Sequence, residues 1–196
     1  MNFLVHLFLS GNDSDLLVGN LLGDFVKGRL EGHFSRPIEQ GIVLHRRMDS
    51  FCGRNPYFLL SKRRIDPSFG HYRGVLVDLF YDHFLARSWA EYSDVPFPQF
   101  LSRTRRVMEE YRDFLPEQLR ALVPYIFSEL IPSYLEIEGI SRALGRMSAR
   151  SKRPSRLGEG GEELKRHYVA LNNDFQLFFP ELREFVREWK GINSTS

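Results

Sequence analysis

The sequence has few of the features that mark a secreted or membrane-embedded protein. Its 196 residues include one cysteine, Cys52, which excludes an internal disulfide and any metal site made of several cysteines. We therefore expect a reducing compartment, namely the cytoplasm. No apolar run approaches the roughly 20 residues that cross a bilayer. The formal net charge is only +2, which does not indicate a strongly polycationic nucleic-acid-binding protein.

Long stretches of alternating apolar and polar residues, typical of half-buried strands, are also scarce. Apolar residues instead recur at helical spacing, and they make up 42% of the chain, enough for a hydrophobic core. The pattern predicts a single compact all-α domain over residues 1–196. We expect helices at residues 16–27, 35–53, 56–64, 71–92, 98–114, 116–131 with a break at Pro124, 137–149, 162–179 and 180–189, and a flexible surface loop at 151–161.

Acidic residues and histidines interrupt several of these apolar segments. His45 and Asp49 are four residues apart on one predicted helix, so both side chains project from the same face. Asp78 and Asp82 repeat this spacing on a later helix, among apolar residues where an uncompensated carboxylate would be costly to bury. A shared divalent cation would neutralise such groups. The seven candidates are His6, Asp24, His45, Asp49, Asp78, Asp82 and His83.

Imidazole and carboxylate ligands without thiolates suit a hydrolytic metal site better than a structural zinc site. Each candidate also has an ordinary structural interpretation as a capped or salt-bridged group. Asp49, for example, can pair with Arg46 or Arg47. Asp82 can likewise pair with Arg87. The remaining residues with reactive side chains are interpreted as surface or packing residues: His33, His71, His167 and Cys52.

Four ordered blocks of sequence carry a family resemblance. They are NFLVHL at 2–7, GNLLGDFVKG at 19–28, GIVLHRRMD at 41–49 and DLFYDHFL at 78–85. In these blocks the chain resembles the bacterial acyl carrier protein phosphodiesterases. The resemblance spans most of the chain, with weaker similarity at 147–150 and 167–171 and a poor match at 93–140.

The resemblance implies an all-α enzyme, distantly related to the HD-type metal-dependent phosphohydrolases, that removes 4'-phosphopantetheine from holo acyl carrier protein. The implied cofactor is a divalent cation, Mn2+ first, with Mg2+ or Fe2+ as alternatives. The dipeptide Asp82-His83 reverses the His-Asp order of the HD signature, so the direct ligands stay open. We expect metal ligands among His6, Asp24, His45, Asp82 and His83, with positions 24, 45 and 82 around one ion, and catalytic roles for Asp24, Asp49 and Asp78.

The implied partner is an acidic carrier protein, for which the chain offers basic clusters. Arg46 and Arg47 lie beside His45, and Arg146 and Arg150 belong to a basic stretch, so we expect these four arginines to dock the substrate. A phosphohydrolase acting on nucleotides or another small phosphodiester is the first alternative. A non-catalytic helical module that binds nucleic acid through residues 142–156 is a second and weaker one. The sequence leaves the oligomeric state open.

Overall fold

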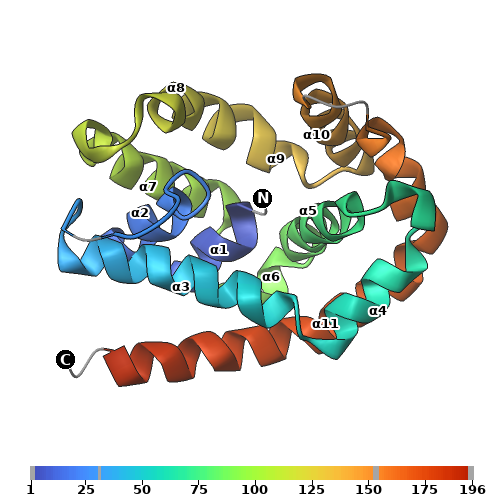
Figure 1. The fold of residues 1–196 in the computed structure, drawn as a ribbon, viewed down its shortest axis with the longest axis horizontal. Coiled ribbons are helices and arrows are strands. Elements are labelled where there is room, and N and C mark those ends of the chain that lie inside the picture. Colours follow the sequence, from blue (N-terminus) through green and yellow to red (C-terminus); the bar gives the residue numbers. More distant parts are fainter. Residues whose placement is uncertain (1–2, 31, 152–154, 194–196) are drawn as a thin grey trace.

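The protein is all-helical in the residues that its computed structural model describes, which are 3–30, 32–151 and 155–193 (Figure 1). No strand occurs in these ranges. This confirms the predicted all-α fold class. The α-helices are α1 (Phe3–Ser10), α2 (Ser14–Leu22), α3 (Arg36–Cys52), α4 (Pro56–Arg64), α5 (Tyr72–Arg87), α6 (Trp89–Tyr92), α7 (Phe97–Glu110), α8 (Glu117–Tyr125), α9 (Ile131–Ser133), α10 (Ile137–Arg150) and α11 (Gly160–Asn193). Short 3-10 helices lie at Pro67–Phe69, Arg112–Phe114 and Leu157–Glu159, and a π-helical turn at Ile126–Leu130 joins α8 to α9.

The apolar start of the chain forms a helix at the centre of the molecule. Helix α1 contacts α2, α3 and α5, and seven of its eight residues are buried (Figure 1). A helix that is apolar on all sides must be enclosed by others. The ionisable side chain on this helix, His6, is therefore buried in the core.

Helices α2 and α3 approach so closely that their backbones touch. A Cβ atom added to Gly19 would lie 2.1 Å from the carbonyl oxygen of Ile38, and one added to Gly41 would lie 2.6 Å from that of Leu16. Only glycine permits such an approach. This contact holds the end of α2 and the middle of α3 in a fixed relation.

Helix α2 ends at Leu22, earlier than the predicted end at Lys27. The amide of Gly23 still bonds back to Asn20 and Gly19, and the amides of Phe25 and Val26 both bond to the carbonyl of Leu22 in a tight turn. Asp24 therefore lies on a turn after the helix and not within it.

The C-terminal third of the chain differs from the prediction in two ways. The predicted break at Pro180 is wrong, because α11 runs for 34 residues with Pro180 inside it. Part of the predicted loop at 151–161 is also ordered against the core, since Leu157 is buried and α11 begins at Gly160. Residues 152–154 of that loop lie outside the described residues. Among the described helices, none is both long and apolar enough to cross a membrane.

Candidate metal centre

A polar hollow of about 280 Å³ opens between α1, the turn after α2, α3 and α5. Five of the seven candidates from the sequence line it, together with residues of α3, α4 and the start of α5. The lining residues are His6, Asp24, His45, Asp49, Cys52, Gly53, Phe58, His71, Gly74, Val75 and Asp78.

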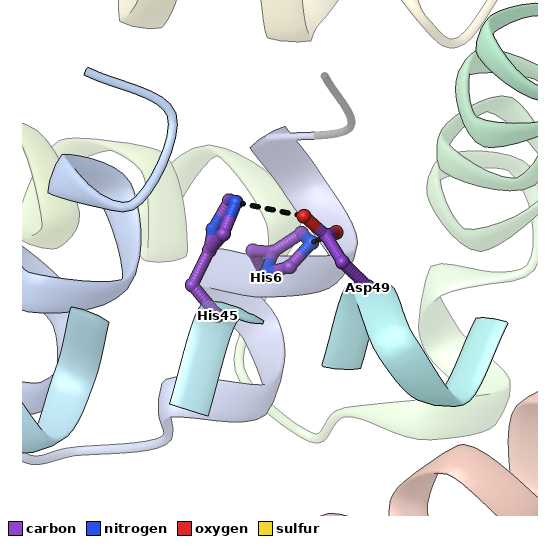
Figure 2. Close-up of side chains that lie close together, drawn as sticks. All are labelled: His6, His45 and Asp49. Carbon is purple, nitrogen blue, oxygen red and sulfur yellow. Dashed lines mark ion pairs between the residues drawn. The ribbon is translucent and has the colours of Figure 1, made fainter. Parts of the chain in front are cut away.

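Three of these side chains converge within ligand distance of one another. Figure 2 shows His6 from α1 facing His45 and Asp49 from α3. Nε2 of His6 lies 3.4 Å from Oδ1 of Asp49, and Nε2 of His45 lies 3.4 Å from Oδ2 of the same carboxylate. Oδ1 of Asp24 lies 3.8 Å from Nε2 of His45. The two imidazole rings stack with their centroids 4.1 Å apart.

Asn20 fixes the orientation of both imidazoles. Its Nδ2 donates to the backbone carbonyl of His6 and to Oγ of Ser10, so its Oδ1 is the acceptor that faces Nδ1 of His6 at 2.8 Å. The backbone carbonyl of Asn20 accepts from Nδ1 of His45, also at 2.8 Å. Because both Nδ1 atoms carry the proton, both Nε2 atoms present a lone pair to the hollow.

Gly23 makes room for His45. A Cβ atom added to Gly23 would lie 2.2 Å from Cγ of His45, closer than any non-bonded contact allows. The turn after α2 therefore packs directly on the imidazole, and the same turn carries Asp24 beside it.

The electrostatics favour a neutral imidazole and an ionised carboxylate. Burial lowers the pKa of His6, and the neighbouring His45 adds to this effect, although the nearby carboxylate of Asp49 opposes it. For Asp49, burial disfavours the charge, but the imidazoles of His45 and His6 beside its two oxygens outweigh this effect and hold the pKa of the carboxyl well below its usual range. The Asp49 side chain is 63% exposed, so the cluster of His6, His45 and Asp49 is accessible from solvent.

This donor set fits a divalent cation. The two 3.4 Å separations exceed the usual hydrogen-bond length of about 2.7–3.2 Å. They match the spacing of roughly 3.4 Å between ligand atoms that are bonded at about 2.1 Å to one tetrahedral ion. Two nitrogen lone pairs and carboxylate oxygens suit manganese, iron or zinc, and the nearby Cys52 stays a neutral thiol because burial raises its pKa. Histidines that bind metal ions are typically oriented by a hydrogen bond to their other ring nitrogen, as Asn20 orients His6 and His45 here.

Asp78 lines the hollow from α5 and is half-buried. Burial raises the pKa of Asp78 to about 6, and the negative charges of Asp49 and Asp24 act in the same direction. A carboxyl group with this pKa can either accept or donate a proton near neutral pH.

The structure does not bring Asp82 and His83 into this group, which corrects the expectation that positions 24, 45 and 82 surround one ion. The Asp82 carboxylate accepts from the amides of Leu4 and Val5 at 3.0 and 2.9 Å, where it satisfies the free N–H groups at the start of α1. Burial raises the pKa of Asp82, whereas the bonds from the two amides favour the ionised carboxylate.

His83 is held by two other partners. Its Nδ1 donates to the carbonyl of Tyr134 at 2.7 Å, and its Nε2 lies 3.1 Å from the hydroxyl of Tyr168. Asp82 shares a helix face with Asp78, but it lies one turn further along α5, where it meets the start of α1 instead of the hollow. Asp82 and His83 therefore both have structural partners in this fold.

The four expected docking arginines lie in two places. Arg46 donates from Nη2 to the carbonyl of Val26 at 3.1 Å, and Arg47 is exposed beside it on α3. Arg146 and Arg150 are exposed on α10 and border a second, apolar cavity. The alternative pairing of Asp49 with Arg46 or Arg47 is not what the carboxylate adopts, since its partners are two imidazoles.

Three residues that shape the hollow were not among the candidates from sequence: Asn20, Gly23 and His71. Asn20 interrupts an apolar stretch and is fully buried, so it gave the same signal as His6. Gly23 gave no signal, because its role depends on the position of His45. His71 was interpreted as a surface residue, and it is exposed, but it also lines the hollow.

Comparison with known proteins gives a consistent result. A family model described as acyl carrier protein phosphodiesterase matches residues 1–182. A protein of that name from Enterobacter sp. (strain 638) is 32% identical over 184 residues, covering 93% of this chain and 95% of the relative. One from Pectobacterium atrosepticum is 30% identical over 189 residues, covering 95% and 98%. No solved structure gives a significant match, so the predicted HD-like architecture stays a prediction.

Proposed function

Because the chain belongs to the acyl carrier protein phosphodiesterase family, we propose that it hydrolyses the phosphodiester that joins 4'-phosphopantetheine to holo acyl carrier protein. The products are apo carrier protein and 4'-phosphopantetheine. The observation that carries this proposal is the convergence of His6, His45 and Asp49 in an open polar hollow, with both Nε2 lone pairs directed into it.

We propose that His6, His45, Asp49 and Asp24 hold one divalent cation, with manganese as the first candidate and magnesium or iron as alternatives. When bound, such a cation lowers the pKa of water and stabilises charge that develops on the phosphoryl oxygens. Asp49 and Asp24 differ in exposure, at 63% and 18%, so Asp49 faces the entrance and Asp24 the interior. Asn20 keeps both imidazoles in the tautomer that this role requires.

We propose that Asp78 transfers the proton during hydrolysis. Hydrolysis of a phosphodiester needs a group that takes a proton from the attacking water or gives one to the departing serine oxygen of the carrier protein. Asp78 lines the same hollow, and its pKa of about 6 lets it exist in either form at neutral pH. It comes from α5, a different helix from those that carry the two histidines.

The carrier protein is proposed to approach over the basic residues Arg46, Arg47, Arg146 and Arg150. Their positive charge complements an acidic protein partner. The chain's single cysteine supports the further proposal of a cytoplasmic location, where carrier-protein chemistry proceeds under reducing conditions.

The direct test is to incubate holo acyl carrier protein with the purified chain, with and without Mn2+, and to follow the mass of the carrier protein. We expect loss of the prosthetic group only when the cation is present. Nucleotide mono- and diphosphates serve as competing substrates in parallel. Cleavage of nucleotides without cleavage of holo carrier protein would replace this function with the small-molecule alternative.

Three variants locate the activity. His45→Ala and Asp24→Ala remove proposed ligands, and we expect each to lower kcat/KM by at least about 100-fold. Asp78→Asn keeps the shape of the side chain but not its titration, and we expect about a 100-fold loss in kcat with little change in cation affinity. Wild-type turnover in all three folded variants would disprove the site.

A further inference from the structure

A second hollow, of about 320 Å³, lies next to the metal centre and is mostly apolar. It falls in the size range of small-ligand pockets. Its walls come from α1, the turn after α2, α5, α8, the π-helical turn and α10. The lining residues are Phe3, Phe25, Leu79, Gln118, Leu122, Tyr125, Ile126, Leu130, Tyr134, Ala143, Arg146, Met147 and Arg150.

Three separate elements contribute to both hollows, so the two are neighbours. On α1, Phe3 lines the apolar hollow and His6, one turn later on the same face, lines the polar one. The turn after α2 and helix α5 each contribute two consecutive residues, one to each hollow. Asp24 and Asp78 line the polar hollow, and the residues that follow them, Phe25 and Leu79, line the apolar one.

The two arginines of the far wall, Arg146 and Arg150, are both exposed, and the rest of the lining is mostly apolar. Arg146 places its guanidinium 5.0 Å from the ring centre of Tyr125, bonds to the hydroxyl of the same tyrosine, and lies 3.8 Å from Glu129. Ile126 and Leu130 come from the π-helical turn, a feature that often occurs at functional sites. The cavity therefore suits an uncharged apolar chain.

We propose that this cavity binds the acyl chain of an acylated pantetheine arm, while the phosphate end of the same arm occupies the polar hollow. The inference rests on the proposed function and names residues that set the preference for acyl-chain length. A free fatty acid has the same apolar chain but lacks the phosphate that the polar hollow would hold. Each methylene that enters the cavity is expected to increase affinity about fourfold, until the cavity is full.

The test measures binding of 4'-phosphopantetheine and its S-butanoyl and S-octanoyl thioesters to the Mn2+-loaded protein by calorimetry. In the wild type, the octanoyl form is expected to bind at least about 30-fold more tightly than the unacylated form, because several methylenes are buried. Ala143→Leu fills the cavity and should reduce this ratio at least about tenfold. Met147→Phe fills it from a partly exposed position and provides a second variant if the first folds poorly.

Two controls make each result decisive. Val169→Leu adds the same kind of volume on α11 at a residue that is 72% exposed, and it should leave the ratio unchanged. Octanoate, tested alone, should bind at least about tenfold more weakly than the S-octanoyl arm. Equal affinities for all chain lengths, an unchanged ratio in both filled variants, or octanoate binding as tightly as the thioester would overturn the assignment.

The binding test also separates this inference from the proposed function. If holo carrier protein is cleaved but affinity does not depend on chain length, the acyl-chain assignment fails alone. If holo carrier protein is not cleaved and yet the filled variants lose affinity for the octanoyl arm, the hydrolase proposal fails while the cavity assignment stands.

Discussion

At the scale of single residues, buried hydrogen bonds decide which polar side chains are available for chemistry. Asn20 uses its side-chain oxygen, its amide group and its backbone carbonyl to hold His6, Ser10 and His45. Asp82 and His83 use their polar atoms on the backbone of α1, on Tyr134 and on Tyr168. The first arrangement leaves two lone pairs open to the hollow, whereas the second leaves none.

The first residue-scale prediction concerns Asn20. Asn20→Leu removes the acceptor for Nδ1 of His6, and we expect Mn2+ affinity to fall about 10- to 100-fold by calorimetry. Ser10→Ala is the matched control, since Ser10 bonds to the same amide group but touches neither imidazole ring. It should lower the melting temperature slightly and leave Mn2+ affinity unchanged. Equal losses of affinity in both variants would assign Asn20 to stability alone.

We predict that Asp82 stabilises the fold and does not bind the cation, although the sequence suggested a metal ligand. Asp82→Asn leaves at least one of the Leu4 and Val5 amides without its carboxylate acceptor, so the free energy of unfolding should fall by about 1–3 kcal/mol. Mn2+ affinity should stay within about twofold of wild type. A loss of affinity at unchanged stability would restore Asp82 as a ligand.

The third concerns the pH dependence of stability through His83. Burial lowers the pKa of His83, partly opposed by its bond to Tyr134, so the unfolded chain binds this proton more readily than the native state does. The contribution of His83 is therefore complete above the unfolded pKa of about 6.5 and is lost as the pH falls below it. Between pH 7.5 and 5.5 the wild type should lose stability relative to His83→Asn, by at most about 1.4 kcal/mol, measured by urea unfolding. His83→Asn keeps a donor near the position of Nδ1, and a pH-independent difference would disprove this account.

At the scale of helices, close packing positions the site and also overrides local sequence signals. The contact of Gly19 with Gly41 brings α2 onto α3, and Gly23 then lies on the ring of His45. On α11, Pro180 removes one backbone hydrogen bond, yet the helix continues because apolar residues on both sides of it are buried. These include Phe175, Phe178, Phe179, Leu182 and Val186. Tertiary burial of one helix face outweighs the cost of about 3 kcal/mol that proline imposes inside a helix.

The prediction at this scale uses Gly23. Gly23→Ala places a methyl group where His45 now lies, so the imidazole must move and Mn2+ affinity should fall at least about tenfold. Gly53→Ala is the matched control in the same hollow, because its Cβ would meet its nearest neighbour, the carbonyl oxygen of Asp49, at an ordinary 3.6 Å. Wild-type affinity in Gly23→Ala would show that the turn after α2 adapts without moving the ring.

At the scale of the whole molecule, charge is nearly balanced but unevenly placed. The net charge of +2 gives no long-range attraction, and we therefore propose that an acidic carrier protein is recognised through local basic residues such as the exposed Arg47 and Arg150. Interactions between exposed charges weaken when salt shortens the screening length to a few ångströms.

We therefore predict that KM for holo carrier protein rises several-fold between 50 and 500 mM NaCl, while kcat changes little. Arg47→Ser and Arg150→Ser should each raise KM about two- to tenfold at low salt and reduce its dependence on salt. Arg187→Ser, which removes an exposed arginine paired with Glu184 on α11, is the control. A KM that does not respond to salt would indicate an apolar interface instead.

The sequence by itself determined the helical class, most helix boundaries and the family blocks, because these depend on residues close together in the chain. It also identified His45 and Asp49 as partners, since a spacing of four residues on a helix fixes their common face. Only the tertiary structure decided that His6 and Asp24 join them while Asp82 and His83 do not. Which polar side chains meet is set by how α1, α2, α3 and α5 pack against one another, and that packing depends on close backbone contacts between segments that are distant in sequence.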